Sequence, residues 1–313
     1  MYPSKILIFG EYTILLNSHA LAIPYDRYGG EWAFMDNQTD NAPEEAHQSN
    51  LNLKQLLADI KSGEKYQNAG FSLDVKALEK DLENGLYYKS LIPQGIGLGS
   101  SGSLVAAVFD RYVKSGTGNS EIHNLKNYLA SLESLYHMNS SGFDPLVSYL
   151  KSPVLITGNE KIEKLNFPVN HSIKKYGVFL VNSQYSRNTG PLVNHFKHKC
   201  KTNLKYFNEI NENYIPVNNE CVQEFISNNH PEIFFSKIKV LTNLQMDLFK
   251  EMIPENLASV MEYGWETSLF YLKLCGSGGG GFFLGFTGDT LKTQAYFKAY
   301  GYNIILLKSL LSD

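Results

Sequence analysis

Short runs of apolar and β-branched residues predict several strands in the first half of the chain. The predicted strands cover residues 5–9, 13–16, 20–24, 32–35, 86–92, 147–150 and 154–156. The polar stretch 36–50 predicts a surface loop, and a charged hairpin over 158–161 follows the last of these strands. Other segments have apolar residues three or four positions apart, which predicts helices. The clearest covers residues 122–136, and two more cover 75–82 and 104–113.

The second half begins with a predicted buried strand and continues with four predicted helices within residues 190–270. The buried strand covers residues 176–181. After the helices come a strand at 271–275, a glycine run at 276–281, a strand at 282–286, a helix at 290–299 and a final strand at 302–307. Because strands and helices mix without regular βαβ alternation, the pattern favours two α+β domains over a doubly wound sheet. We place the boundary near residue 165, which gives domains 1–165 and 166–313.

Composition narrows the class of protein. The 313 residues are 43% hydrophobic and 19% charged, which excludes a disordered chain. A net charge of -3 offers no broad basic surface, so we expect neither nucleic acid nor membrane as a partner. Three widely spaced cysteines form neither a disulfide framework nor a zinc cluster. With no apolar stretch near the length of a spanning helix, we expect a cytoplasmic protein.

The most informative segment is the glycine-rich loop at residues 93–103, PQGIGLGSSGS, between a predicted strand and an apolar helix. A helix N-terminus attracts phosphate through its unpaired N–H groups and dipole, and serine hydroxyls add donors or a magnesium ligand. A capped strand-to-helix turn is the alternative, but it does not need four glycines and three serines in nine residues. The match to G-x-G-x-x-G lacks the second strand of a dinucleotide site, and Ser103 stands where a Walker A loop needs lysine.

A second glycine run, KLCGSGGGG at residues 273–281, lies between two apolar strands. A flexible hairpin is one interpretation, but five glycines cost considerable conformational entropy. We therefore favour close approach of this backbone to a ligand or to the first glycine loop. Two such turns in one chain indicate a nucleotide-binding protein.

Two acidic residues lie near the end of the strongest predicted helix. Glu133 falls at the edge of its buried face near the C-terminus, where the dipole disfavours a carboxylate unless it meets a metal or a base. Asp144 lies in a Ser-Gly-Phe-Asp-Pro turn that we expect to lead into a strand; an ordinary Asp-Pro turn is the alternative. Magnesium-dependent phosphoryl transfer needs one carboxylate on the metal and another at the nucleophile.

Three segments together resemble motifs of the GHMP family of small-molecule kinases. Residues 93–102 are similar to P-x-x-x-G-L-[GS]-S-S-A, residues 273–281 to K-L-T-G-A-G-G-G-G, and residues 5–12 to K-x-x-L-x-G-E-H. Two more segments resemble the mevalonate kinases within that family. Residues 133–144 are similar to E-x-x-x-H-x-N-P-S-G-[VI]-D, and residues 182–193 to N-[ST]-K-V-P-R-N-T-x-x-L-V.

The resemblance implies a two-domain GHMP kinase fold with the nucleotide and substrate site between the domains. Asp144 would be the catalytic carboxylate near the acceptor hydroxyl, and Lys5 its neighbouring cation. Ser101 and Glu133 would hold Mg²⁺. The implied ATP-binding residues are Pro93, Gly95, Gly97, Leu98, Gly99, Ser100, Ser101, Gly102 and Ser103. The implied acceptor-side residues are Glu11, Tyr12, Ser141, Arg187, Thr189, Gly276, Gly278 and Gly279.

Three positions depart from the family motifs. Tyr12 replaces a histidine that lies at the acceptor pocket of mevalonate kinases, Gly102 replaces alanine, and Ser140 replaces proline. Relative to alanine, glycine at 102 weakens a helix start by less than about 1 kcal/mol. The segment before Arg187 also differs from the motif.

The expected activity is ATP-dependent phosphorylation of a small-molecule alcohol, with mevalonate as the leading acceptor and isoprenoid precursor synthesis as its setting. Alternatives are phosphomevalonate kinase, diphosphomevalonate decarboxylase, another metabolite kinase, or a non-catalytic nucleotide-binding relative. The expected partners are the alcohol and ATP with Mg²⁺, and a homodimer is left open as the assembly.

Overall fold

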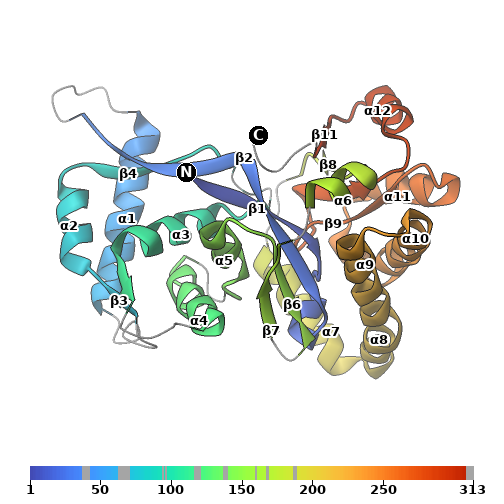
Figure 1. Ribbon diagram of the computed structural model, residues 1–313, viewed down its shortest axis with the longest axis horizontal. Helices are drawn as coiled ribbons and strands as arrows, with labels where there is room; N and C mark the ends of the chain where they lie inside the picture. The colour runs from blue at the N-terminus through green and yellow to red at the C-terminus, as the bar shows by residue number, and fades with distance from the viewer. Residues whose placement is uncertain are drawn as a thin grey trace. The chain divides into compact units, whose positions relative to one another are not determined.

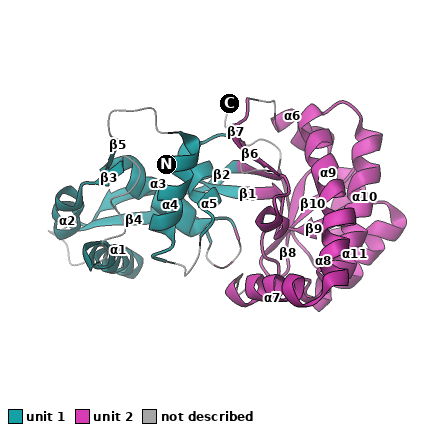
Figure 2. Ribbon diagram, turned by 90° about the horizontal axis from the view of Figure 1, so that it is seen from below, with its two compact units in different colours: residues 1–5, 24–93, 98–152 teal, residues 6–23, 94–97, 153–313 magenta. Residues whose placement is uncertain are grey.

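The chain divides into two compact units (Figure 2). The structure, a computed structural model, describes residues 1–36, 43–62, 71–93, 95, 97–115, 121–136, 140–158, 161–166, 169–185 and 189–307. Unit 1 comprises residues 1–5, 24–93 and 98–152, and unit 2 comprises residues 6–23, 94–97 and 153–313. Strands β1 (Tyr2–Phe9) and β2 (Ala20–Phe34) pair with each other and contribute residues to both units. The division at residue 165 stays a prediction about domains.

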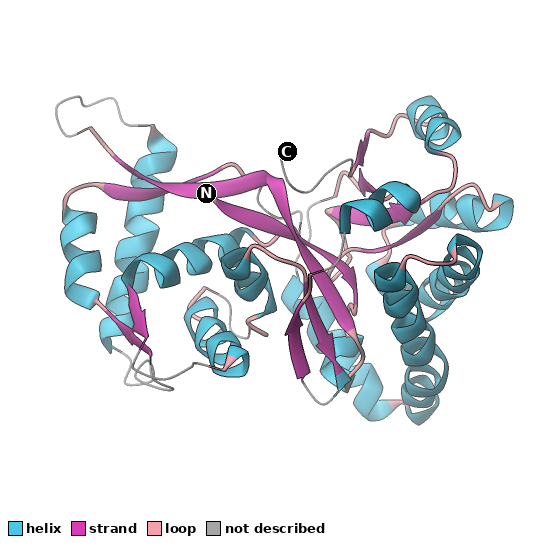
Figure 3. Ribbon diagram, viewed as in Figure 1, coloured by secondary structure: helices cyan, strands magenta, loops and turns pink. Residues whose placement is uncertain are grey.

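Unit 1 consists mainly of helices (Figures 1 and 3). These helices are α1 (Glu44–Ser62), α2 (Val75–Glu83), α3 (Ser100–Tyr112), α4 (Ile122–Glu133) and α5 (Phe143–Leu150). Strand β4 (Leu86–Ser90) pairs antiparallel with the second half of β2, and β3 (Phe71–Leu73) pairs with β5 (Val113–Ser115). Helices α3, α4 and α5 pack against one another.

Unit 2 contains an antiparallel sheet with the strand order β11-β8-β10-β9. Its strands are β8 (Phe179–Asn182), β9 (Tyr271–Leu274), β10 (Phe282–Phe286) and β11 (Ile304–Leu306). Strand β6 (Val154–Thr157) pairs with the first half of β2 and with β7 (Lys161–Lys164). The helices of unit 2 are η1 (Thr13–Leu16), α6 (Val169–Lys175), α7 (Thr189–Thr202), α8 (Leu204–Glu209), the π-helix η4 (Ile210–Tyr214), α9 (Ile215–Ser227), α10 (Pro231–Leu248), η5 (Lys250–Met252), α11 (Glu255–Thr267) and α12 (Thr290–Ala299).

Aromatic side chains fill the core of unit 2. Phe9 at the end of β1 stacks on Phe286 of β10, with ring centroids 5.9 Å apart and planes 4° apart. Phe225 of α9 and Phe234 of α10 meet the same pair edge-on. Because such arrangements add to the stabilisation from burial, these contacts anchor α9 and α10 to the sheet. The mixture of helix and strand in both units confirms the predicted α+β class.

Two predicted strands are wrong. Residues 13–16 form the 3₁₀ helix η1, flanked by left-handed backbone at Asn17 and a positive φ of 59° at Tyr12. Residues 147–150 are the last turns of α5. Their apolar run reflects a short helix with Leu146 and Val147 completely buried, and periodicity alone cannot separate such a helix from a buried strand.

Two other boundaries also differ. The polar stretch 36–50 is not all loop, because α1 begins at Glu44, with Glu44 and Glu45 in its first turn. The strands predicted separately at 20–24 and 32–35 are one continuous strand, β2. Among the described residues, no helix is long and apolar enough to cross a bilayer.

Candidate active site

The first glycine loop turns directly into helix α3. Gly95, Gly97 and Gly99 all have positive φ, between 74° and 86°, which only glycine adopts readily. Gly99 is the N-cap residue of α3, so the loop leads into a helix N-terminus whose N–H groups suit an anion. Gln94 and Ile96 lie outside the described residues. In this part of the loop, Pro93 and Gly95 are exposed and Leu98 is buried.

The three serines of the loop have different surroundings. Ser100 and Ser101 are partly exposed at the start of α3. Ser103 is completely buried: its hydroxyl donates to the Tyr2 carbonyl over 2.8 Å and lies 2.6 Å from the Tyr88 hydroxyl. The side chain of Ser103 therefore joins α3 to β1 and β4 inside unit 1. The backbone N–H of Ser103 is also engaged, because it donates to the Gly99 carbonyl over 3.0 Å. The predicted role of Ser103 in binding ATP stays a prediction.

Glu133 ends α4 with a buried carboxylate that meets two serine hydroxyls. Ser101 donates to Oε1 over 2.8 Å, and Ser140 donates to Oε2 over 2.5 Å. Burial, and secondarily the negative charge of Asp144, raises the pKa of Glu133 to about 7, while the two serines and Lys5 lower it. The prediction that Glu133 and Ser101 belong to one site is therefore supported by direct contact between them.

Asp144 lies in the first turn of α5, and the prediction that it precedes a strand is wrong. Its Oδ1 is 3.0 Å from Nζ of Lys5, which is almost completely buried while Asp144 is 34% exposed. Lys5 is held in place by its backbone N–H, which donates to the Leu98 carbonyl of the glycine loop over 3.0 Å. The predicted lysine–aspartate pair thus lies beside the loop.

Two glycines permit the close packing around this pair. A Cβ at Gly99 would lie 3.0 Å from Cγ of Lys5 and 3.4 Å from Oδ2 of Asp144. A Cβ at Gly102 would lie 2.8 Å from both the carbonyl carbon and the Cβ of Asp144, closer than real Cβ atoms come. The glycine at 102, where the resembling motif has alanine, therefore lets α3 approach the start of α5.

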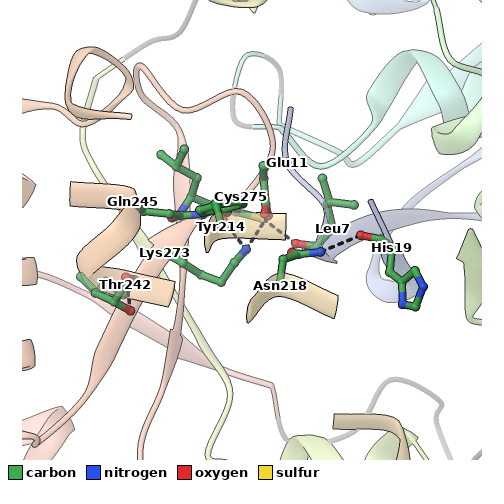
Figure 4. A network of polar contacts seen from close by, with 11 residues as sticks. Leu7, Glu11, His19, Tyr214, Asn218, Thr242, Gln245, Lys273 and Cys275 are labelled. Atoms are coloured by element: carbon green, nitrogen blue, oxygen red, sulfur yellow. Dashed lines mark hydrogen bonds and ion pairs between the residues drawn. The ribbon is translucent and has the colours of Figure 1, made fainter. Parts of the chain in front are cut away.

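The predicted acceptor-side residues Glu11 and Tyr12 are both buried, and both belong to unit 2. Oε1 of Glu11 is 2.5 Å from Nζ of Lys273 in β9, and both side chains are completely inaccessible to solvent. Lys273 also donates to the Leu274 carbonyl and lies 5.5 Å from the centroid of the Phe9 ring. Figure 4 shows these groups converging from β9 and the turn after β1.

Further polar groups extend this network across unit 2. Gln245 of α10 donates to the Tyr214 hydroxyl over 2.7 Å and accepts from the Leu274 N–H over 2.8 Å. Burial raises the pKa of Tyr214 well above its usual range, and the nearby Glu11 carboxylate raises it further. The network therefore joins η4 and α10 to the strand that carries Lys273 (Figure 4).

Tyr12 is packed rather than exposed. Its ring stacks on Phe249, 5.4 Å away, and contacts Phe196 at 5.1 Å, while its hydroxyl donates to the Ser277 carbonyl. Ser277 belongs to the second glycine run, so Tyr12 ties that run to the turn after β1. This contact explains how a tyrosine is accommodated at residue 12.

The second glycine run approaches other backbone and side chains of unit 2. Gly276 and all four glycines of 278–281 have positive φ. A Cβ at Gly278 would lie 2.5 Å from the Met252 carbonyl oxygen, and one at Gly279 would lie 2.5 Å from Leu192. The Gly279 N–H donates to Met252 over 2.6 Å. The structure shows this backbone close to η5 and α7. Its predicted approach to a ligand or to the first glycine loop stays a prediction.

The remaining predicted residues are less constrained. Ser141 is exposed, and its hydroxyl accepts a long bond of 3.3 Å from the Phe143 N–H. Arg187 lies outside the described residues, and Thr189 begins α7 with its side chain also outside them. Their roles toward an acceptor stay predictions.

Lys273 and Ser140 are among the residues of these networks for which the sequence predicts no role. Lys273 lies within the apolar run Tyr271–Cys275. Because a buried lysine requires a partner, its position in this run indicates a buried ion pair. Ser140 was noted only as a departure from a proline. Its bond to Glu133 depends on how α4 and α5 meet, which no local pattern reveals.

The fold of the chain matches that of solved GHMP kinases over nearly its whole length. Mevalonate kinase from Methanococcus jannaschii is 18% identical with a TM-score of 0.63, covering 97% of this chain and 95% of that one. Phosphomevalonate kinase from Streptococcus pneumoniae, in complex with phosphomevalonate and AMPPNP, is 17% identical with a TM-score of 0.62, covering 97% of each chain. Galactokinase from Lactococcus lactis, complexed with galactose, is 15% identical with a TM-score of 0.64, covering 97% and 90%. No family model matches the chain, and no curated protein matches it.

Proposed function

We propose that this protein is an ATP-dependent kinase that phosphorylates the hydroxyl of a small-molecule alcohol. The observation that carries the proposal is the ion pair of Lys5 and Asp144, 3.0 Å apart, beside the glycine loop that begins α3. Phosphoryl transfer depends on positioning and on neutralising charge, and this cluster supplies both. The shared fold of three kinases with different acceptors supports the class of reaction.

The start of α3 would bind the phosphates of ATP. Its N–H groups and dipole favour negative charge, and Gly97 and Gly99 bend the loop so that backbone groups are presented. Ser100 and Ser101 add hydroxyls at the same end of the helix. The phosphorylated nucleotide in one structural neighbour, AMPPNP, supports ATP as the donor.

The residues around Glu133 fit Mg²⁺. This ion usually takes one or two carboxylates together with phosphate oxygens, and it requires hard oxygen ligands. Glu133 and Ser101 would supply a carboxylate and a hydroxyl that already touch. The raised pKa of Glu133 indicates a buried carboxylate whose negative charge is under-compensated, as suits a cation ligand. When bound, the metal neutralises charge that develops on the transferring phosphate.

Asp144 and Lys5 would act on the acceptor. A carboxylate that is one-third exposed in a first helical turn can accept the proton of a bound hydroxyl as it attacks phosphorus. Lys5 holds this carboxylate in one orientation, and its ammonium group is placed to steady negative charge on the phosphoryl oxygens.

Mevalonate is the leading acceptor, because residues 133–144 and 182–193 resemble the mevalonate kinases most. A different small-molecule alcohol is the second candidate, and the burial of Tyr12 favours it. The Tyr12 hydroxyl donates its hydrogen bond to the Ser277 carbonyl. The buried Tyr12 therefore does not replace the histidine of the motif as a donor to an acceptor carboxylate. Recognition of mevalonate would then depend on other residues, of which Arg187 and Thr189 are the predicted ones.

The test is ADP release with MgATP, measured against mevalonate, phosphomevalonate, homoserine, galactose and a control without acceptor. Turnover with mevalonate supports the leading acceptor, and turnover with another alcohol keeps the kinase but changes its specificity. ATP binding without turnover on any of them would favour a non-catalytic relative.

A second experiment tests the role of Asp144 directly. Asp144→Asn should lower kcat by at least about a hundredfold, the usual contribution of a positioned general base, while ATP binding changes little. Asp110→Asn is the matched control, because Asp110 is an exposed aspartate of the same unit that accepts a bond from Tyr2. Undiminished turnover in Asp144→Asn would show that this carboxylate is not the base.

A further inference from the structure

Ser140 lies between α4 and α5 and bonds to both sides of that connection. Its hydroxyl donates to Oε2 of Glu133 over 2.5 Å and accepts from the Gly142 N–H over 2.9 Å. Glu133 is the last residue of α4, and Gly142 is the N-cap residue of α5. One side chain therefore links a buried carboxylate to the turn that carries Asp144 two residues later.

The turn itself has little freedom to move. Gly142 has a φ of 71°, and a Cβ there would lie 2.3 Å from the Lys126 carbonyl oxygen and 2.9 Å from the Cβ of Ala130. The backbone at residue 142 is thus fixed against α4. Because its N–H points at the Ser140 hydroxyl, the oxygen of Ser140 is fixed as well, and its proton is directed to Glu133.

The two oxygens of Glu133 are consequently held by hydroxyls from different places. Ser101 holds Oε1 from the start of α3, and Ser140 holds Oε2 from the turn before α5. A carboxylate with one donor can rotate about its terminal torsion, which is broad, whereas donors on both oxygens define its plane. Orientation of a ligand by such outer partners commonly decides how well a metal binds.

We propose that Ser140 is a positioning residue: it fixes the plane of the Glu133 carboxylate for a divalent cation and couples that carboxylate to the turn that carries Asp144. This inference rests on the proposed kinase function. The motif that residues 133–144 resemble has proline at this position, which carries no hydroxyl, so the device belongs to this chain and not to the motif.

The experiment compares Ser140→Ala, Ser140→Thr and the control Ser134→Ala in the full chain. Ser134 follows Glu133 in the chain, and its hydroxyl donates a 2.8 Å hydrogen bond to the Ala130 carbonyl. Ser134→Ala therefore removes a serine hydrogen bond of similar length that does not involve the Glu133 carboxylate. Mn²⁺ binding in the presence of ATP, measured by titration calorimetry, is the first readout. The Mg²⁺ concentration for half-maximal turnover and the KM for the acceptor are the second.

Ser140→Ala should weaken Mn²⁺ binding about tenfold and raise the half-saturating Mg²⁺ concentration by a similar factor, the lower end of the range for outer partners of metal ligands. The acceptor KM should stay within about twofold, because Ser140 does not touch the acceptor in the proposed mechanism. Ser140→Thr, which keeps the hydroxyl, should restore most of the affinity. Ser134→Ala should match the wild type in every readout.

Three results would overturn the proposal. Equal Mn²⁺ affinity in Ser140→Ala and Ser134→Ala would show that the bond to Glu133 does not serve the metal. Loss of affinity together with a loss of stability that Thr does not rescue would indicate a purely structural role. Absence of Mn²⁺ and ATP binding in the wild type would remove the metal site and the kinase proposal together. If the wild type binds both but transfers no phosphoryl group, the kinase proposal fails, and the calorimetry still decides the role of Ser140.

Discussion

Gly102→Ala is the substitution on which local sequence and tertiary structure disagree. On sequence grounds the change should help, because alanine is the better helix former and occupies this position in the motif that the loop resembles. In the structure the new methyl group would lie 2.8 Å from the carbonyl carbon and Cβ of Asp144 and 2.9 Å from the nitrogen of Pro145. These are backbone and Cβ atoms rather than the flexible end of a side chain, so α3 or α5 must shift.

The magnitudes favour the structural expectation. Replacing glycine by alanine within a helix stabilises by about 0.5–1 kcal/mol. Extra methyl groups in a well-packed interior cost about 1–3 kcal/mol. We therefore expect Gly102→Ala to lower the free energy of unfolding by about 1 kcal/mol and, because the shift falls on Asp144, to lower kcat by about tenfold.

Stability is measured by urea unfolding, monitored through tryptophan fluorescence. Activity is measured as ADP release with MgATP and the acceptor that supports turnover. Gly190→Ala is the matched control: Gly190 is in the first turn of α7, and a Cβ there meets nothing within 4 Å. The control should be as stable as the wild type or more stable. If Gly102→Ala were as stable and as active as Gly190→Ala, the close contact of α3 with Asp144 would not be a constraint in this protein.

Further predictions concern buried charge. Lys273→Met should lower the free energy of unfolding by about 3–5 kcal/mol, because it leaves the buried Glu11 without its cation. The double variant Glu11→Leu/Lys273→Met should recover most of that loss in urea unfolding, and a double variant as unstable as the single one would contradict the pairing. Without metal or nucleotide, in EDTA, Glu133 has a pKa of about 7 in the folded protein and 4.5, the ordinary value, in the unfolded chain. Between these two pH values the folded protein therefore holds a proton that the unfolded chain has lost. Stability should therefore fall as pH rises from 4.5, the ordinary value, to about 7, by up to about 3 kcal/mol. Glu133→Gln should flatten this slope, and an unchanged slope would assign it to another group.

Much of the chemistry could be predicted because it is recorded in local segments. Gly95, Gly97 and Gly99 of the first glycine loop have the positive φ that glycine adopts readily, whereas Gly102 lies within helix α3. Glu133 and Asp144 each stand out as an acid in an apolar or turn context. The helix predicted at 75–82 from its apolar spacing is present as α2, and the helix predicted near 290–299 is present as α12. These features depend on neighbours in sequence, so a single sequence contains them.

Other features required the tertiary structure. The apolar run at 147–150 is helical because α5 is buried on several sides, and burial from several directions erases the periodicity that distinguishes helix from strand. The pairing of Glu11 with Lys273 joins residues 262 positions apart, and its energy depends on complete burial that composition cannot reveal. Local spacing likewise gives no account of why Tyr12 is accommodated by Phe249 and Ser277.

The departures from the resembling motifs show this division most clearly. From the sequence alone, Gly102 predicts a slightly weaker helix start, and Ser140 predicts no particular effect. In the structure both surround the start of α5: Gly102 provides the space for Asp144, and Ser140 bonds Glu133 to the Gly142 backbone. The sequence by itself determined the candidate residues for the proposed chemistry, because chemical identity and turn conformation are local. The tertiary structure decided how those residues are oriented, because orientation depends on packing between helices distant in the chain.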